Sequence, residues 1–269
     1  MITFPNAKIN LGLCITEKRP DGYHNLESVF YPVGWTDVLE ILPADEASFK
    51  STGLPIPGEK ATNLCLKAYI LLKTDFDLPP VRMHLHKVVP IGAGLGGGSA
   101  DGAFTLSLLN GQFSLGLSAA QLEEYARKLG SDCAFFIQNQ PRFCFGKGDE
   151  FSETSISLAG VWAVLVNPGI HISTAEAYAG VKPRKPETDL RQALSQARGT
   201  WRETVQNEFE ESLLPRYPVM ARLKEKLYEA GAFYASVTGS GSTLYGLFTQ
   251  QVDVSSLFDN HPVWQGVLE

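Results

Sequence analysis

Residues 90–101 have the composition of a phosphate-binding loop, because five of the seven residues from 92 to 98 are glycine. Glycine lets backbone N–H groups turn inward at dihedral angles that a Cβ atom forbids, and it lets the chain approach a ligand closely. The residues that follow favour a helix, which we expect Ser99 to cap. Since the N-terminus of a helix attracts anions, this segment is predicted to bind a polyphosphate.

Two better-known glycine loops do not fit this segment. Gly92, Gly94 and Gly97 match G-x-G-x-x-G, but a dinucleotide-binding fold then needs a strand ending in an acidic residue about twenty positions later. Residues 118–123 read Ser-Ala-Ala-Gln-Leu-Glu, which predicts a capped helix there. A Walker A loop needs Lys before its Ser or Thr, which is absent after Gly98. A surface linker is disfavoured, because a strand pattern precedes the loop and a helix pattern follows it.

Two segments far apart in the chain place polar side chains where they could face a ligand. Lys8 and Asn10 alternate with the apolar residues Ile9, Leu11, Leu13 and Ile15, so both point off the other face of a predicted strand. That arrangement is typical of a solvated edge strand, and it also suits a ligand-facing pair. Asp132 directly precedes an apolar run, where it is expected either to cap a helix or to face a cleft.

An aromatic pair on a loop is of functional interest if a flat ligand that forms hydrogen bonds lies nearby. Tyr23 and His24 end a polar connection that contains a Pro-Asp-Gly turn. Ser173 and Glu176 form a predicted capping box for a short helix that carries Tyr178.

The elements around the glycine loop are predicted from periodicity. Strands are expected at residues 28–33 and 37–42, a helix at 62–73 with Asn63 near its start, and a strand at 81–89 that leads into the loop. Lys87 interrupts the apolar face of that strand. His84 and His86 lie on its other face, and without a third ligand they are predicted to be solvated.

The pattern restarts after residue 150, and we place a domain boundary near residue 155. A strand is predicted at 161–166, helices at 203–214 and 217–230, and strands at 233–238 and 243–248. The last two strands flank Gly-Ser-Gly-Ser at 239–242. This turn is either a simple hairpin or, if it lies near the first glycine loop, a cover for a substrate or phosphate.

The composition is that of an ordinary globular protein, with 44% hydrophobic and 19% charged residues. A net charge of −6 argues against nucleic-acid and anionic-membrane binding, and no apolar run is long enough to cross a bilayer. The four cysteines form no C-x-x-C pair, so we expect reduced, mostly buried thiols in a cytoplasmic protein.

Three segments of the chain closely resemble the GHMP kinase superfamily. Pro-Asn-Ala-Lys-Ile-Asn-Leu at 5–11 matches its opening motif, residues 90–100 match its ATP-phosphate loop, and residues 238–242 match its third motif. Asp-Gly-Tyr-His at 21–24, Gly-Ser-Asp at 130–132 and Pro-Gly-Ile-His-Ile-Ser-Thr at 168–174 resemble the members that act on a cytidine-diphospho sugar alcohol. Ala134 stands where many members carry proline.

The resemblance implies an α+β fold of two subdomains, residues 1–155 and 156–269, with the active site in the cleft between them. It implies a transferase that uses ATP and Mg²⁺ to phosphorylate the 2-hydroxyl of 4-diphosphocytidyl-2-C-methyl-D-erythritol. That reaction belongs to the non-mevalonate route to isoprenoids. A small molecule is thus the expected partner, and no protein ligand for the metal is assigned.

The resemblance also implies roles for individual residues. Asp132 would be the catalytic base and Lys8 its catalytic partner. The expected nucleotide-binding residues are Pro90, Ile91, Gly92, Ala93, Gly94, Leu95, Gly96, Gly97, Gly98, Ser99 and Ala100, with Asn63 and Lys87 at the adenosine end. The expected substrate-binding residues are Asn10, Tyr23, His24, Thr174, Tyr178, Gly239 and Ser240, with the two tyrosines on either side of the cytosine.

Two other functions remain open on these residues. A GHMP kinase for homoserine, mevalonate or a sugar would not need the aromatic residues Tyr23, His24 and Tyr178. A catalytically silent nucleotide-binding module would have no chemical need for both Lys8 and Asp132.

Overall fold

The computed structural model describes residues 1–186, 188–254, 256–258 and 260–269. Within it the chain forms two compact units that are each discontinuous in sequence. The first unit contains Met1–Ala7, Trp35–Ile91 and Gly96–Gln140, and the second contains Lys8–Gly34, Gly92–Leu95 and Pro141–Glu269. The boundary near residue 155 stays a prediction, because these units are not consecutive stretches of chain.

The first unit is built on a four-stranded sheet with the order β1-β4-β6-β5. Its strands are β1 (Ile2–Thr3), β4 (Val38–Pro43), β5 (Ser48–Gly53) and β6 (Val81–Lys87). β6 pairs antiparallel with β4 and parallel with β5, so that Met83 lies between Ile41 and Phe49. Residues of β6 alternate between buried and accessible positions, as the predicted strand requires, and His84 and His86 both hydrogen-bond to Thr52 Oγ1 at 2.9 Å.

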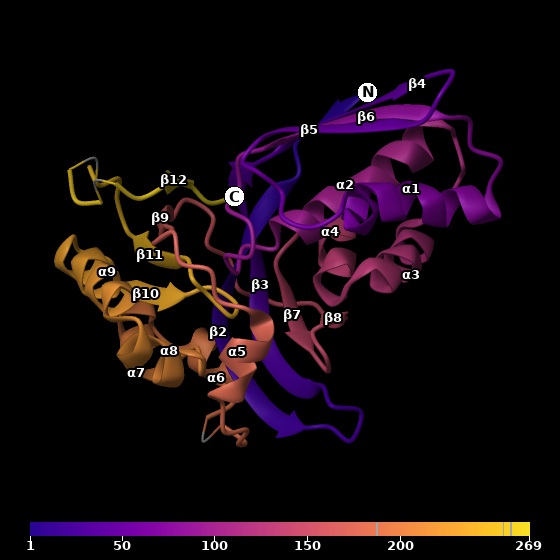
Figure 1. Cartoon of the computed structure of the whole chain (residues 1–269). Coiled ribbons are helices and arrows are strands. Elements are labelled where there is room, and N and C mark those ends of the chain that lie inside the picture. The colour runs from indigo at the N-terminus through magenta and orange to yellow at the C-terminus, as the bar shows by residue number, and fades with distance from the viewer. Residues whose placement is uncertain (187, 255, 259) are drawn as a thin grey trace. The chain divides into compact units, whose positions relative to one another are not determined.

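Helices lie on one side of this sheet (Figure 1). They are η1 (Lys60–Thr62), α1 (Leu64–Asp75), α2 (Gly97–Gln112), α3 (Ala119–Leu129), η2 (Ser131–Ala134) and α4 (Phe135–Gln138). The predicted start signals for α1 and α3 are confirmed. Asn63 Oδ1 accepts a hydrogen bond from Cys65 N, and Ser118 forms a capping box with Gln121. The helix that starts at Ser118 confirms that no dinucleotide-binding second strand lies there.

The second unit contains one further sheet and most of another. One has the order β10-β11-β9-β12, from β9 (Trp162–Val166), β10 (Tyr234–Val237), β11 (Leu244–Phe248) and β12 (Val263–Val267). The other has the order β2-β3-β7-β8, from β2 (Asn6–Lys18), β3 (His24–Thr36), β7 (Arg142–Phe145) and β8 (Glu150–Ser152). The predicted strands 161–166, 233–238 and 243–248 are therefore confirmed.

The helices of the second unit are α5 (Thr174–Ala179), α6 (Leu190–Ser195), η3 (Arg198–Thr200), α7 (Trp201–Thr204), α8 (Glu210–Arg216) and α9 (Pro218–Glu229). α9 buries Met220, Leu223 and Leu227 and lies beside β10 and β11 (Figure 1). The predicted helix at 217–230 is confirmed.

The predicted helix at 203–214 is wrong, because the chain leaves the helical path between α7 and α8. Asn207 is buried there, and its side-chain amide donates to the carbonyl oxygens of Val237 and Gly239 at 2.8 and 2.9 Å. Leu13 N also donates to Gln206 O at 2.9 Å. These tertiary hydrogen bonds replace helical ones, and helical periodicity in the sequence does not report them.

The capping box predicted for α5 forms only in part. Ser173 Oγ accepts from Glu176 N at 3.1 Å, as expected. The Glu176 side chain instead contacts the Tyr217 hydroxyl and the Arg216 guanidinium. Ser173 thus caps the N-terminus of α5. The Glu176 side chain instead links α5 to Arg216 at the end of α8 and to Tyr217, the next residue.

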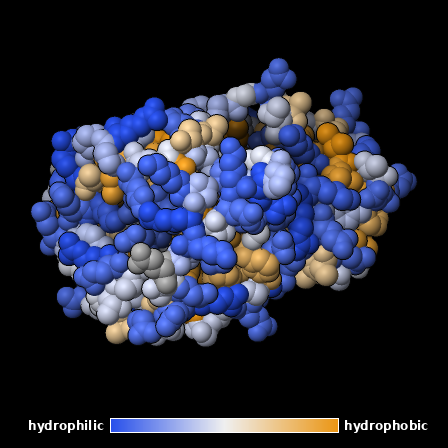
Figure 2. Space-filling view, turned by 90° about the horizontal axis from the view of Figure 1, so that it is seen from below, coloured by the Kyte–Doolittle hydropathy of each residue, from blue (hydrophilic) through white to orange (hydrophobic). Residues whose placement is uncertain are grey.

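The hydrophilic surface and the buried cysteines are as expected from the composition. The face shown in Figure 2 is mostly hydrophilic, with its hydrophobic side chains in small separate groups. None of the described helices combines the length and apolarity that crossing a lipid bilayer requires. Cys14, Cys65, Cys133 and Cys144 are all buried, and none of them forms a disulfide, as predicted.

Candidate active site

The glycine loop adopts backbone conformations that favour glycine. Gly92, Gly94 and Gly96 have φ angles of +64°, +77° and +70°. Gly96 is the N-cap of α2 and no side chain caps this helix, so the predicted Ser99 cap is wrong. The left-handed Gly96 starts the helix early and places Ser99 within the first turn. No capping side chain therefore competes with a ligand for the first N–H groups of α2.

Within the second unit, the two glycine-rich segments contact each other. A Cβ atom on Gly94 would lie 2.0 Å from Thr238 O, and one on Gly239 would lie 3.0 Å from Gly94 O. The Thr238 hydroxyl donates to Gly94 O at 3.1 Å. Only glycine allows the two backbones to approach this closely. The turn between β10 and β11 is thus more than a hairpin connection.

Lys8 and Asn10 belong to a buried polar network in the second unit. Lys8 Nζ donates to Asn10 Oδ1 at 2.6 Å, which confirms that both side chains point the same way. Asn10 Nδ2 donates to Ser28 Oγ at 2.9 Å, and the Thr238 hydroxyl donates to Asn10 Oδ1 at 3.3 Å. Lys8 is 3% and Asn10 1% exposed, so neither is the solvated residue of an edge strand. A buried lysine retained in such a network is typical of a functional site.

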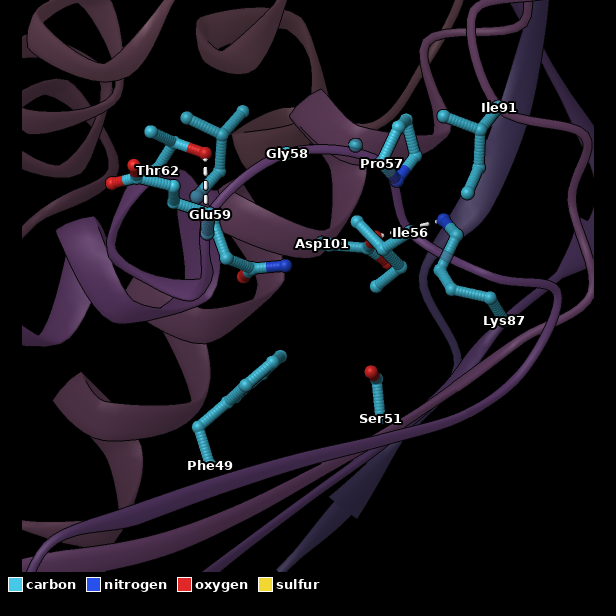
Figure 3. A pocket seen from close by; sticks show the side chains of 13 residues that line it. Phe49, Ser51, Ile56, Pro57, Gly58, Glu59, Thr62, Lys87, Ile91 and Asp101 are labelled. Atoms are coloured by element: carbon cyan, nitrogen blue, oxygen red, sulfur yellow. Dashed lines mark hydrogen bonds and ion pairs between the residues drawn. The ribbon is translucent and has the colours of Figure 1, made fainter.

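A cavity of about 190 Å³ lies in the first unit beside the start of α2 (Figure 3). Its apolar lining comes from Phe49 on β5, Ile56, Pro57, Leu64 and Ile91. Its polar lining includes Ser51, Asn63, Lys87, Gly98 and Asp101. Apolar walls with a few polar groups suit a flat, partly polar ligand such as a nucleoside.

Lys87 is buried between two carboxylates. Its Nζ donates to Asp37 Oδ2 at 2.5 Å and to Asp101 Oδ2 at 2.8 Å. The buried face of β6 carries a lysine at this position because its ammonium group binds the buried carboxylates of Asp37 and Asp101. Figure 3 shows the Lys87 and Asp101 side chains reaching toward each other at the cavity wall.

Asp132 lies in η2, within the first unit, and is half-buried. Gly130 is the N-cap of this short helix, so Asp132 is not its cap. The neighbouring Cys133 side chain hydrogen-bonds to Ser99, and burial raises the pKa of this thiol to about 12. The turn that carries Asp132 is therefore held against the first turn of α2.

The aromatic residues of the predicted base site are partly assembled in the second unit. The His24 and Tyr178 rings stack with centroids 4.7 Å apart and an interplanar angle of 25°. Phe209 packs edge-on against Tyr178 at 5.0 Å. Burial and the charge of Lys18 lower the pKa of His24, so its imidazole is neutral at pH 7. Tyr23 is 62% exposed, with the Lys147 ammonium over its ring.

Comparisons with known proteins agree with these features. Residues 63–147 match the N-terminal domain of GHMP kinases, and residues 187–261 match their C-terminal domain. A 4-diphosphocytidyl-2-C-methyl-D-erythritol kinase of Cytophaga hutchinsonii is 54% identical, over 92% of this chain and 92% of its own length.

The chain belongs to the 4-diphosphocytidyl-2-C-methyl-D-erythritol kinases of the GHMP kinase family. A second such kinase, from Parabacteroides distasonis, is 46% identical over the full length of both chains. A crystal structure of 4-(cytidine 5'-diphospho)-2C-methyl-D-erythritol kinase superposes with a TM-score of 0.82 at 28% identity, covering 100% of this chain and 99% of that one.

Each unit of this small-molecule kinase assembles part of the predicted site. The first unit brings together Asn63, Lys87, the start of α2 and the turn with Asp132. The second brings together Lys8, Asn10 and Gly94 with buried Gly239, and separately His24 with Tyr178. In the second unit, Thr174 is the exposed first residue of α5, and Ser240 is half-buried in the turn after β10.

Sequence reasoning missed Asp37 and Asp101, and it gave Thr238 no individual role. A signal was available for the two acids, because a lysine on the apolar face of a strand requires a buried carboxylate partner. Periodicity identifies the lysine but does not say which acid reaches it. Thr238 lay within the third motif, where its hydroxyl links Asn10 to the glycine loop.

Proposed function

We propose that this kinase transfers the γ-phosphoryl group of ATP to the 2-hydroxyl of 4-diphosphocytidyl-2-C-methyl-D-erythritol, giving the 2-phosphate and ADP. This step belongs to the methylerythritol phosphate route to isoprenoid precursors. The observation that carries the proposal is the similarity to kinases of that name over nearly the whole chain, at 54% identity. Sequence identity at this level, with length preserved on both sides, supports a shared substrate.

The nucleotide is proposed to bind along the loop from Pro90 to Ala100 and in the cavity beside it. The uncapped first turn of α2 supplies N–H groups and a partial positive charge to the phosphates. The apolar cavity wall suits the adenine ring, and Asn63 and Lys87 are the candidates for polar contacts with the adenosine end. Phosphoryl transfer depends mainly on such positioning.

Asp132 is proposed to take the proton of the substrate hydroxyl as it attacks the γ-phosphate. A hydroxyl is a weak nucleophile at neutral pH, and a positioned base contributes roughly 10²–10⁴-fold to the rate. Lys8 is proposed to orient this carboxylate and to offset negative charge on the oxygen that attacks. The hydrogen bond to Asn10 restricts the Lys8 ammonium to one position.

The cytidine half of the substrate is proposed to stack between Tyr23 and Tyr178, with His24 at the polar edge of the base. Stacking on an aromatic ring contributes about 1–3 kcal/mol per base, and hydrogen bonds to the edge supply discrimination. A neutral His24 has one donor and one acceptor nitrogen for that edge. Asn10, Thr174, Gly239 and Ser240 are proposed to contact the methylerythritol or diphosphate portion.

Mg²⁺ is the proposed metal, and it would neutralise phosphate charge during transfer. Among the described residues, no three His, Cys, Asp or Glu side chains are grouped to hold a metal by themselves. This fits a Mg²⁺ ion that arrives with the nucleotide, because Mg²⁺ in kinases takes most of its ligands from phosphates and water. We further propose action in the cytoplasm on a small molecule, without nucleic acid, which fits four cysteines outside any disulfide and a net charge of −6.

The test is an ADP-release assay on a panel of acceptors: 4-diphosphocytidyl-2-C-methyl-D-erythritol, mevalonate, homoserine and galactose. We expect release above the ATPase background with the first acceptor only. Release with another acceptor would assign the chain to a different GHMP activity. ATP binding without release on any acceptor would indicate the silent module.

A further inference from the structure

Asp37, Lys87 and Asp101 form a buried ion cluster next to the phosphate-binding end of α2. The side chains of Lys87, Asp37 and Asp101 are 2%, 0% and 5% exposed. Lys87 Nζ binds one oxygen of each carboxylate, at 2.5 and 2.8 Å. The cluster connects the end of β6 and the β3–β4 corner to the helix that follows the glycine loop.

The charges of this cluster do not balance unless it holds a proton. Two carboxylates and one ammonium leave one buried negative charge, which is costly in a low-dielectric interior. Among the described side chains, the other ionisable groups near Asp101 do not compensate it. Cys65 on α1 is a thiol whose pKa is raised by burial and by Asp101, and Glu59 at the cavity is exposed and acidic.

The hydrogen bonds indicate which carboxylate holds the proton. Asp37 Oδ1 accepts from Val88 N and Val89 N at 2.6 and 2.9 Å, so both of its oxygens are satisfied as an anion. Asp101 Oδ1 is buried and has no hydrogen-bond partner among the described residues. A proton on Asp101 Oδ1 therefore neutralises the cluster without disrupting any existing hydrogen bond.

The electrostatics agree with that assignment. Burial raises the pKa of Asp101 to about 7, and the charge of Asp37 acts in the same direction against the opposing effect of Lys87. For Lys87, burial lowers the pKa, but the two carboxylates outweigh it and the net pKa is raised. Lys87 thus stays charged, and the proton that is lost near neutral pH comes from Asp101.

The cluster lies against the part of α2 proposed to bind phosphate. Asp101 is on α2 one turn after Gly97, and Lys87 Nζ lies 3.4 Å from where a Cβ of Gly97 would be. Both Lys87 and Asp101 line the cavity. If Asp101 lost its proton, the cluster would carry a net negative charge. That charge would oppose a triphosphate at the helix N-terminus.

We propose that Asp101 is the proton-bearing member of this cluster and a positioning residue for the first turn of α2, so that loss of its proton weakens ATP binding. The inference rests on the proposed ATP site but concerns a different residue and a different measurement. By linkage, a ligand that prefers the protonated protein binds more weakly as pH rises through the titration of that proton.

The experiment measures the Kd of ATP by calorimetry from pH 6 to pH 8.5 for the wild type, Asp101→Asn and Asp77→Asn. Asparagine mimics the neutral carboxyl group and cannot ionise, so the affinity of Asp101→Asn for ATP should change with pH only through the titration of ATP itself. Relative to this variant, wild-type affinity should fall by about tenfold at pH 8.5. Asp77 is an exposed acid of the same unit, and its variant should follow the wild type. Titration of ATP itself affects all three proteins alike.

Thermal unfolding without ATP gives a second readout of the proton. Since the pKa of Asp101 is raised in the folded state, the folded protein binds more protons than the unfolded chain between about pH 4 and pH 7. Wild-type stability should therefore fall as pH rises through that range, and Asp101→Asn should remove this part of the slope.

The proposal would be overturned if the Kd of ATP changed with pH in the same way for the wild type and for Asp101→Asn. Failure of the wild type to bind ATP at any pH would instead overturn the proposed function and the coupling to ATP, while the unfolding profile still reports the proton. Lys87→Met, which leaves both acids without a cation, should raise the Kd of ATP and destabilise the fold, with Lys87→Arg restoring part of both.

Discussion

The ammonium group of Lys8 donates a hydrogen bond to Asn10 Oδ1 at 2.6 Å, two residues further along β2. This contact fixes the direction of a side chain that has four rotatable bonds and is 3% exposed. Asn10 is in turn held by Ser28 and Thr238. The orientation of the proposed catalytic lysine therefore depends on residues from β3 and from the turn after β10.

We expect Asn10→Ala to lower kcat at least tenfold, because a small misplacement of a catalytic group is costly. If Asn10 acts through Lys8, the same change should cost little more in a Lys8→Met background. Measuring kcat for both single variants and the double variant checks this. Losses that multiply in the double variant would show that Asn10 acts independently. Urea unfolding of each protein separates the effect from lost stability.

Asp132→Asn should lower turnover at least about a hundredfold while ATP and substrate still bind, because the amide cannot accept the hydroxyl proton. Single-turnover kinetics together with calorimetric Kd values test both parts. Asp45→Asn removes an exposed carboxylate from the same unit and serves as the control. Near-normal turnover in Asp132→Asn would exclude Asp132 as the base.

Tyr178→Ala should raise the KM of the cytidylated substrate by roughly tenfold or more, as expected for a lost stacking contact. The KM of ATP should change far less, since His24 and Phe209 are the aromatic neighbours of Tyr178. Tyr125→Ala on α3 removes a tyrosine whose hydroxyl binds Asp75 at an exposed position, and should leave the substrate KM unchanged. Equal increases in both KM values would refute the base sandwich.

Asn63→Ala should lower the free energy of unfolding by about 1 kcal/mol, because Asn63 caps α1. It should also raise the KM of ATP, because Asn63 lines the cavity. Ser118→Ala is the matched control, since Ser118 caps α3 and is not among the residues that line the cavity. Both variants should melt at lower temperature, and only Asn63→Ala should affect ATP. An equal rise in the KM of ATP in both would attribute the effect to stability alone.

Local patterns in the sequence determined much of this protein. Alternation and capping residues predicted β6, β9, β10, β11 and the starts of α1 and α3, because hydrophobic period and caps act over a few neighbouring residues. The glycine content of the phosphate loop and its motifs likewise identified the family without coordinates, since they are contiguous in the chain.

Only the tertiary structure decided how distant polar groups are paired. Asn207 ends the helical path because it reaches the carbonyls of Val237 and Gly239, thirty or more residues away. The buried position of Lys87 is explained by its contacts with Asp37 and Asp101, which are 50 and 14 residues away. Buried charges must find partners wherever the fold supplies them, and that requirement leaves no periodic trace in the sequence.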